Sequence, residues 1–578
     1  MTQGTPIERT TPLGRLALES DLDIDRGGPN GPPSAEIVRA VLEDVYEIEL
    51  PNDRAVHDVL DVVNQPRAVS SVIVAWDGRI GPLEVGARAD GAVLVGDDGT
   101  SLAAHLDGST ITFDEPLPYG MHTLSVGWAG RESLATVISA PSRLPTPQPG
   151  MWGVYASAFA LRGTADLGIG DFTALGQLAE SIHSRGGHFV ATLPVLPLFV
   201  DAPVDITPFT PITRTAWNEL HVDLAKAPGA EAIEDVVVEP PERTPRLVDY
   251  PEVARRQRHS LRAYARVVGA HPALRAELDR FLVLNPNIAQ YARFRALGET
   301  LSRDWRRWPA PWRHGDLSNA PVDGDIELMH QVGQWLASTQ MTRLIDEMRD
   351  RGQRLQLELP VGTHPLGYDV WADQSSHCRR TRVLEAPDGS APGMDTGHLA
   401  LRTWRDRRRG HRTFAAAVHH HARGGFLRID QISELWRSWV VPDGADPGEG
   451  VYLRHRPDEL LAIVSLECHR AGAVVTAGNL STATADVRDR LADFGAMAPL
   501  LDGRRCDVDD DDLPVAVHRS GDAALIHLDE VLAGFGPASL DPSDDESYRV
   551  RHPRGINATL DDERVAGWFD DFVATWTS

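Results

Sequence analysis

An arginine and an aspartate stand two residues apart in a strand-like run of the chain. In residues 424–432 (GGFLRIDQI), a single isoleucine separates Arg428 from Asp430. Side chains alternate between the two faces of a strand, so these two are predicted to point the same way. A guanidinium beside a carboxylate holds it ionised, and an ionised carboxylate can attack an anomeric carbon to form a covalent glycosyl intermediate. The alternative is a structural Arg–Asp pair without chemistry.

Four regions of different character surround this run. Residues 1–65 are predicted to form a helical segment. Residues 66–142 contain short β-rich runs separated by turn residues, which is typical of a β-sandwich. A proline-rich linker at 141–150 (PSRLPTPQPG) marks a boundary before the largest region, residues 150–535. Residues 536–578 are predicted to form a C-terminal tail.

The largest region is predicted to have an α/β fold. Apolar strands and helices alternate through residues 150–535, with a mostly helical insertion at about 250–350. This alternation implies a parallel sheet, and the length favours a TIM-type (β/α) barrel. We therefore predict that strands 426–430 and 473–477 are adjacent and parallel. Asp430 is then expected at the mouth of the barrel, because catalytic groups lie at the carboxyl ends of barrel strands.

The C-terminal end of this barrel is predicted to be irregular. The apolar runs 515–517 and 524–526 are separated by six residues, 518–523. A parallel crossover needs about a dozen residues or more. One βα unit is therefore predicted to be missing, which leaves the barrel incomplete and puts Asp522 at the start of the last strand.

Composition excludes several classes of function. The formal net charge of −26 over 578 residues disfavours nucleic acid as a partner, because phosphates need basic surface. The chain contains no run of 18 apolar residues, so no membrane span is predicted. The N-terminus lacks the basic and apolar segments of a secretory signal. Cys378, Cys468 and Cys506 are too scattered for a disulfide framework or a zinc pattern, and indicate reduced thiols in a cytoplasm. The consecutive histidines 419–421 point in different directions on a predicted helix, so they are not arranged to bind one metal ion. We therefore expect surface histidines and no metal site. No cofactor is expected either.

Several ordered segments resemble one enzyme family. Residues 426–470 (FLRIDQISELWRSWVVPDGADPGEGVYLRHRPDELLAIVSLECHR) are similar to the matching run of the amylomaltases, the 4-α-glucanotransferases of glycoside hydrolase family seventy-seven. Residues 152–175, 206–224 and 357–373 resemble the family's opening barrel segment, its substrate loop and its third-strand segment. The resemblance covers about 150 to 500. It implies a cytoplasmic enzyme that transfers segments of α-1,4-glucans or maltooligosaccharides with retention, with Asp430 as nucleophile and Arg428 holding it.

The chain departs from the family at the groups that handle protons. Gly478 stands where the family has its acid/base glutamate, and Asn479 stands at the following aspartate. A retaining mechanism needs two carboxyl groups with separate roles. The candidate for the family's third carboxylate is Asp522 in the run Ser520-Gly521-Asp522, although the spacing described above argues against it.

The resemblance also implies contacts with the substrate. The residues that it assigns to this role are Phe209, Asn218, Asp369 and Trp371. Phe209 stands where the family has a tyrosine hydroxyl, and Gln431 stands where it has a histidine. Because these changes fall at the pocket while the scaffold segments persist, the pattern indicates a relaxed demand on catalysis.

Three functional hypotheses follow. In the first, the protein is a working 4-α-glucanotransferase in which another group replaces the lost acid. In the second, it is a non-catalytic homologue, a pseudoenzyme that binds a glucan or a protein partner. The third is a barrel hydrolase that acts on some other sugar.

Overall fold

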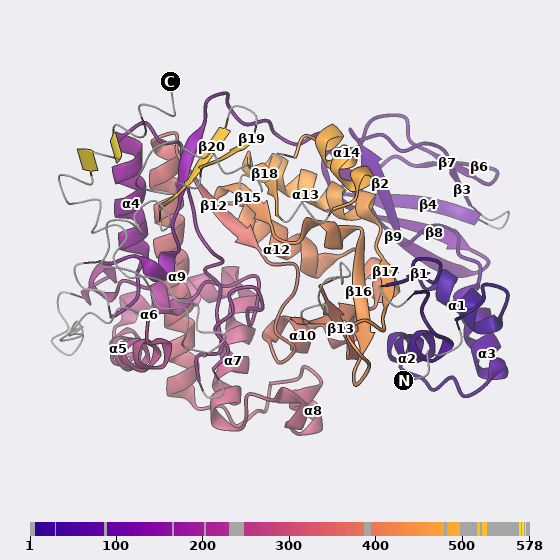
Figure 1. Cartoon of the computed structure of the whole chain (residues 1–578), viewed down its shortest axis with the longest axis horizontal. Coiled ribbons are helices and arrows are strands. Elements are labelled where there is room, and N and C mark those ends of the chain that lie inside the picture. The colour runs from indigo at the N-terminus through magenta and orange to yellow at the C-terminus, as the bar shows by residue number, and fades with distance from the viewer. Residues whose placement is uncertain are drawn as a thin grey trace.

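The computed structural model describes most of the chain. The described residues are 6–28, 31–85, 89–163, 167–201, 204–230, 248–385, 395–478 and 483–496, with short pieces at 517–520, 523–528, 566–567, 569–570 and 573. In Figure 1 the N-terminal helices lie at one end of the molecule, a long group of helices lies at the other, and the largest sheet runs between them.

The largest sheet has seven strands in the order β18-β15-β12-β11-β10-β20-β19. All neighbours except β19 and β20 pair in parallel. The strands are β10 (Trp152–Tyr155), β11 (Phe189–Ala191), β12 (Arg354–Leu359), β15 (Gly425–Ile429), β18 (Val474–Ala477), β19 (Val517–Ser520) and β20 (Ala523–His527). The predicted parallel pairing of 426–430 with 473–477 is confirmed, and the fold is of the α/β class.

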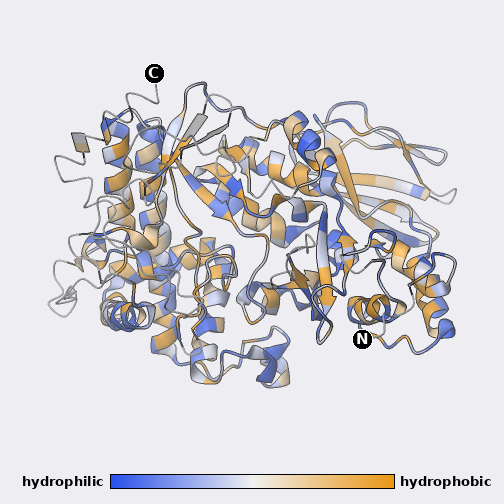
Figure 2. Cartoon of the chain, in the orientation of Figure 1, coloured by the Kyte–Doolittle hydropathy of each residue, from blue (hydrophilic) through white to orange (hydrophobic). Residues whose placement is uncertain are grey.

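Helices cover this sheet because its strands are apolar on both faces. Nearly every residue of β10, β11, β12, β15 and β18 is buried, as expected for parallel strands between helical layers. The covering helices are α4 (Phe172–Ser184), α9 (Gly324–Asp350), α12 (Arg412–Ala422), α13 (Pro457–Ala471) and α14 (Ala485–Phe494). Figure 2 shows hydrophobic and hydrophilic residues interspersed along α4 and α9, which is the pattern of helices with one buried face.

Further helices extend the region between β11 and β12. They are α5 (Tyr250–Ala270), α6 (Pro272–Leu284), α7 (Pro286–Thr300) and α8 (Ala310–Arg313). Proline at the first turn of α5, α6 and α7 costs no hydrogen bond, because the first amides of a helix have no partner within it. Two short helices, α10 (Tyr368–Ala372) and α11 (Thr403–Arg408), follow β12.

A second, five-stranded sheet has the order β1-β17-β16-β13-β14 and is antiparallel. Its strands are β1 (Leu22–Asp23), β13 (His377–Leu384), β14 (Asp395–Leu401), β16 (Arg437–Pro442) and β17 (Val451–Arg454). The N-terminal helices α1 (Pro12–Glu19), α2 (Ala35–Tyr46) and α3 (Asp53–Val63) share a buried core with it. The chain's first strand is therefore an edge strand of a sheet whose other strands come from residues 377–454.

Residues 72–140 form two further sheets, with orders β2-β9-β8-β4-β5 and β3-β7-β6. The strands are β2 (Val72–Trp76), β3 (Leu83–Glu84), β4 (Ala89–Val95), β5 (Ser101–Leu102), β6 (His105–Asp107), β7 (Thr110–Thr112), β8 (Gly120–Trp128) and β9 (Arg131–Ala140). Leu94, Leu124 and Ile111 bury their side chains in the core that the two sheets share.

The last two described strands bear on the predicted deletion. β19 and β20 pair antiparallel, which agrees with the prediction that 518–523 holds no crossover. Asp522 lies outside the described residues, whose next strand begins at Ala523. The missing βα unit, the closure of the barrel and the domain boundaries stay predictions.

The state of the cysteines and the hydrophobicity of the helices were also predicted from the sequence. Cys378 and Cys468 are buried free thiols, while Cys506 lies outside the described residues. Among the helices in the described part of the chain, none is long and apolar enough to cross a membrane.

Asp44 on α2 ties the N-terminal helices to the second sheet. Its carboxylate accepts the backbone N–H groups of Arg379 at 2.9 Å and Arg380 at 2.7 Å, and the hydroxyl of Thr381 at 2.9 Å. The buried guanidinium of Arg402 lies 3.6 Å away. One carboxylate thus satisfies several groups that water cannot reach.

We expect Asp44→Ala to lower the free energy of unfolding by about 3–5 kcal/mol, because it removes one member of a buried charge pair and leaves amides without a partner. The measurement is chemical denaturation followed by circular dichroism. The matched control is Asp58→Ala on the exposed side of α3, which should change stability by less than about 0.5 kcal/mol. Equal effects of the two variants would contradict this role of Asp44.

Candidate active site at the carboxyl ends of the parallel strands

Three neighbouring strands bring the predicted catalytic residues together. In the pairing of β12 with β15, Glu358 stands opposite Arg428. In the pairing of β15 with β18, Ile429 stands opposite Ala477. Asp430 and Gly478 therefore follow the ends of adjacent strands at one edge of the sheet. The backbone N–H of Gly478 donates to the carbonyl of Ile429 at 2.7 Å, and that of Asp430 donates to Leu359 at 3.0 Å.

Arg428 makes its ion pair with Glu358. The Nε of Arg428 donates to Oε1 of Glu358 at 2.7 Å, and both side chains are about 95% buried. The positive charge of Arg428 also lowers the pKa of Asp430, and the role of Arg428 in holding Asp430 stays a prediction. Glu358 was missed as a site residue, although a single charged residue inside the apolar run 355–359 is a sequence feature that could have identified it.

The carboxyl group of Asp430 is harder to ionise than the sequence indicated. Burial and, second, the negative charge of Glu358 raise its pKa, the positive charge of Arg428 partly opposes them, and the net result is a pKa of about 7. The effect of Arg428 on Asp430 has the expected direction, but burial and the charge of Glu358 outweigh it. One guanidinium serves two carboxylates, and the more distant one keeps an affinity for its proton.

Gly478 lies directly against this cluster. A Cβ atom added to it would lie 2.9 Å from the carbonyl oxygen of Ile429, 3.1 Å from Cα of Asp430 and 3.2 Å from Nη2 of Arg428. The predicted adjacency of the glycine to Asp430 is thus present in the structure. Any longer side chain at this position must displace backbone or the Arg428 guanidinium. Asn479 lies outside the described residues.

Asp430 is followed by a strained turn. Gln431 has a φ of 47°, in the left-handed region, and starts the short helix η7 (Ile432–Leu435). Such a conformation is uncommon for a residue other than glycine and is found at functional turns. Glu434 on η7 is a further negative charge that raises the pKa of Asp430.

The predicted substrate residues are mostly inside the protein. Asp369 accepts from the hydroxyl of Thr213 at 2.6 Å and from the backbone N–H of Arg214 at 3.0 Å, which fixes the loop after residue 210. Asn218 caps the short helix η2 (Glu219–His221). Trp371 is 1% exposed, and its Nε1 donates to the carbonyl of Trp312.

Phe209 differs from these three, because its ring is 36% exposed. The buried residues support the loop that carries it, while a direct contact of any of the four with a sugar stays a prediction. A phenyl face at the surface can pack on a pyranose ring, but it lacks the hydroxyl that the resemblance assigns to this position.

The histidine run departs from expectation. Only His419 is at the surface, where its ring nitrogen contacts Glu467 at 2.8 Å. His420 and His421 are 7% and 1% exposed, and burial lowers their pKa values. The prediction of surface histidines is therefore wrong for two of the three, because the helix α12 turns these rings toward its neighbours. The described part of the chain contains no cluster of His, Cys, Asp and Glu that could hold a metal ion.

Comparison with known proteins agrees with this architecture. The family profile described as 4-alpha-glucanotransferase matches residues 156–499. The 4-alpha-glucanotransferase of Mycobacterium tuberculosis is 31% identical over 410 residues, which cover 65% of this chain and 56% of that protein. The Haemophilus influenzae 4-alpha-glucanotransferase is 23% identical over 420 residues, covering 66% of this chain and 60% of the relative. The chain thus spans somewhat more than half the length of these relatives.

Solved structures show the same fold. The crystal structure of amylomaltase from Corynebacterium glutamicum superposes with a TM-score of 0.72 at 22% identity, covering 87% of this chain and 76% of that chain. The amylomaltase from Streptococcus agalactiae in complex with acarbose gives a TM-score of 0.55 at 18% identity, covering 63% and 76%. With a family match over more than half of its length, this chain belongs to the 4-alpha-glucanotransferase family of glycoside hydrolases.

Proposed function

We propose that the protein acts on or binds α-1,4-glucans through the cluster of Asp430, Arg428 and Glu358, on a TIM-type barrel. The fold similarity to amylomaltases and the run of parallel strands support the barrel. An amylomaltase of similar fold was solved with acarbose, which supports a maltooligosaccharide as the ligand. The observation that carries the proposal is the position of Asp430 at the carboxyl end of β15, beside a buried guanidinium.

In the active form of this proposal, ionised Asp430 is the nucleophile. It attacks the anomeric carbon, and the bond to the departing glycosyl oxygen breaks as a glycosyl-enzyme ester forms. The hydroxyl of a second sugar then attacks the anomeric carbon of this ester and loses its proton to solvent. The bond between that carbon and the Asp430 oxygen breaks, which regenerates Asp430, and the two inversions give net retention. Arg428 stabilises both carboxylates of the cluster, and Glu358 fixes the orientation of Arg428 through its 2.7 Å bond.

The proton that the departing oxygen needs has no evident donor in this cluster. Gly478 has no side chain, and Glu358 is tied to Arg428. Asp430 itself carries a proton below a pH of about 7, but a protonated Asp430 is not a nucleophile. One carboxyl group cannot act as acid and as nucleophile in the same step.

This gap favours the second candidate function, a non-catalytic homologue that binds a glucan. The observation behind it is the packing of Gly478, where an added Cβ would lie 2.9 Å from the carbonyl oxygen of Ile429 and 3.1 Å from Cα of Asp430, so that a side chain there requires these neighbours to shift. A sheet edge shaped in this way can still present the sugar-binding loops of the family. A cytoplasmic location stays a prediction from the cysteines, and a protein partner stays an open alternative for the ligand.

The first test compares a normal donor with an activated one. Without a general acid, disproportionation of maltotriose should be about 10²–10⁴-fold slower than in an enzyme that has one. This corresponds to an activation barrier that is higher by roughly 3–5 kcal/mol. Maltosyl fluoride should react measurably faster, because fluoride leaves without a proton. Products are followed by chromatography and by fluoride release.

Asp430→Ala is the control for this comparison, and it should abolish turnover of the fluoride. Disproportionation of maltotriose at ordinary rates would show that another residue supplies the proton. If neither donor reacts while maltodextrin binds by calorimetry, the non-catalytic function is the correct one. If maltodextrin also fails to bind, both candidates are wrong.

The second test uses pH. Since the pKa of Asp430 is raised to about 7, its ionised form is present above pH 7 and is lost as the pH falls. Turnover of maltosyl fluoride should therefore drop about tenfold per pH unit below pH 6 and level off above pH 8. Glu358→Gln removes the negative charge that raises this pKa and frees Arg428, so it should move the midpoint to lower pH. A profile that is flat from pH 5 to 8 would contradict the assignment of Asp430 as nucleophile.

The third test concerns Gly478. We expect Gly478→Ala to cost about 1–3 kcal/mol of stability, because the added methyl group collides with the backbone of Ile429 and Asp430. Gly478→Glu should be at least as destabilising and should not restore transfer. Gly81→Ala is the control, since a Cβ at Gly81 meets nothing within 4 Å. Full transfer activity of Gly478→Glu at unchanged stability would contradict this prediction, because it would show that the backbone near Ile429 and Asp430 can make room for the glutamate.

A further inference from the structure

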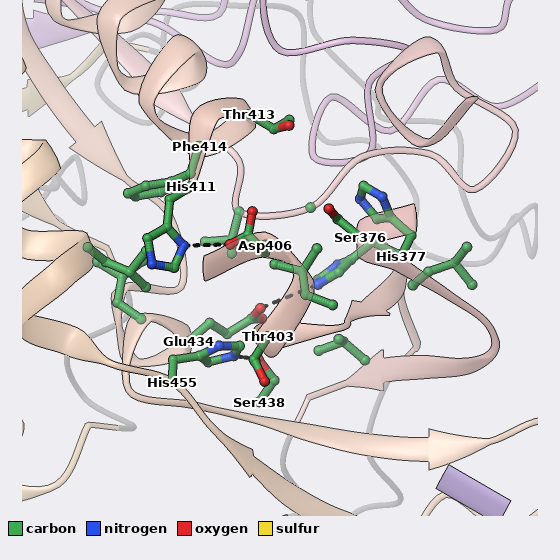
Figure 3. A pocket seen from close by; sticks show the side chains of 18 of the residues that line it. Ser376, His377, Thr403, Asp406, His411, Thr413, Phe414, Glu434, Ser438 and His455 are labelled. Atoms are coloured by element: carbon green, nitrogen blue, oxygen red, sulfur yellow. Dashed lines mark hydrogen bonds and ion pairs between the residues drawn. The ribbon is translucent and has the colours of Figure 1, made fainter. Parts of the chain in front are cut away.

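A separate cavity lies behind the turn that follows Asp430. It is bounded by the end of β12, by η7 and by the second sheet with α11 and α12, and Figure 3 shows its side chains. Its volume is about 80 Å³, whereas one water molecule needs roughly 10–15 Å³, so it has room for about five to eight waters or one small molecule. Among the described residues that line it, Asp430, Gly478 and Phe209 do not occur. The cavity is therefore distinct from the cluster described above.

Three buried polar atoms in its wall lack a hydrogen-bond partner within the described chain. They are Oγ1 of Thr363, Oγ of Ser376 and Oε2 of Glu434. Thr363 is 4% exposed and Ser376 is 1% exposed. Nε2 of His398 comes within 3.4 Å of Glu434 Oε2, an ion-pair distance without hydrogen-bond geometry. Buried polar atoms without partners cost free energy, and two hydroxyls with one carboxylate oxygen are complementary to the hydroxyl groups of a ligand.

Most of the charged groups around the cavity already have partners. His411 lies between Asp406 at 2.5 Å and Glu459 at 2.9 Å. Arg214 pairs with Asp369 in the same wall. The ring of His455 contacts the Ser438 hydroxyl at 2.9 Å, and burial lowers its pKa to about 4, so it is neutral at pH 7. A charged ligand would lose its hydration here, and the carboxylate of Glu434 already has the His398 ring within 3.4 Å, which favours an uncharged ligand.

The remaining wall is apolar, and the cavity reaches the surface at one side. Leu399, Leu435 and Phe414 contribute hydrocarbon surface, which suits the C–H groups of a sugar ring. The lining also includes Arg456, which is exposed and pairs with Asp21 at 2.7 Å. A small molecule has a route inward past this surface pair.

We propose that this cavity is a second binding site for a small, uncharged, polyhydroxylated molecule of about the size of one hexose. Its hydroxyl groups donate to Glu434 and exchange hydrogen bonds with Thr363 and Ser376, while its ring packs on Phe414 and the leucines. Glu434 belongs to η7, the turn that starts two residues after Asp430, so an occupant contacts the segment that carries the candidate nucleophile. Binding here does not depend on transfer activity, and the two proposals can fail separately.

The test is calorimetry of the full chain with three hexose derivatives that differ in charge. D-glucose should bind with a dissociation constant of about 1–10 mM, as expected for so few ligand atoms. D-glucosamine and D-gluconate, which carry one positive and one negative charge, should bind at least about tenfold more weakly. Thr363→Val combined with Ser376→Ala should weaken D-glucose binding by about tenfold or more, because two hydrogen bonds are lost.

Two further variants separate this cavity from the catalytic edge. Asp430→Asn should leave D-glucose binding unchanged, whereas a site at the catalytic edge would lose it. The melting temperature of Thr363→Val/Ser376→Ala without sugar should not fall, since the removed hydroxyls have no partner in the chain; this shows that the variant is folded. The proposal is overturned if D-glucose does not bind, if Asp430→Asn abolishes binding while the double variant does not, or if D-glucosamine binds more tightly than D-glucose.

Discussion

The ion pair between Arg428 and Glu358 is the interaction on which the carboxyl edge of the parallel sheet depends. It joins β12 to β15 at 2.7 Å with both groups buried, and removing either partner leaves a charge without compensation in the protein interior. The same pair sets the chemistry of its neighbour. Burial of Asp430 raises its pKa most, and the negative charge of the paired Glu358 adds to it, so that Asp430 holds its proton up to a pH of about 7. The pair that fixes the geometry of the cluster therefore also contributes to the low acidity of the candidate nucleophile.

The absence of a side chain at residue 478 belongs to the same packing arrangement. The end of β18 approaches β15 so closely that the carbonyl of Ile429 accepts the N–H of Gly478 at 2.7 Å. A Cβ at this position would press on Asp430 and on the Arg428 guanidinium. A side chain at this position would therefore require its neighbours to shift, because the space beside Gly478 is already filled by backbone and by the guanidinium.

The second sheet connects this edge to the rest of the molecule. Its strands come from residues 22–23, 377–401 and 437–454, and the buried carboxylate of Asp44 fixes the N-terminal helices to β13. The segment from Asp430 to Arg437 runs from the main sheet into this second sheet, with the left-handed Gln431 at its start. The cavity lined by Glu434 and His455 lies within this connection. Side chains far from Asp430 in sequence therefore support the turn beside it.

The sequence alone determined the fold class, the parallel pairing of β15 with β18, the position of Asp430 after its strand and the lack of a crossover between β19 and β20. These follow from local patterns, such as strand alternation and the minimum length of a crossover, which need no knowledge of distant residues. Only the tertiary structure decided that Arg428 pairs with Glu358, that Asp430 resists ionisation, and that His420, His421 and Trp371 are buried. Each of these depends on which side chains meet from strands and helices separated by tens to hundreds of residues, and on how much water they exclude. A sequence pattern places a side chain on a face, whereas partners and burial are properties of the packed chain.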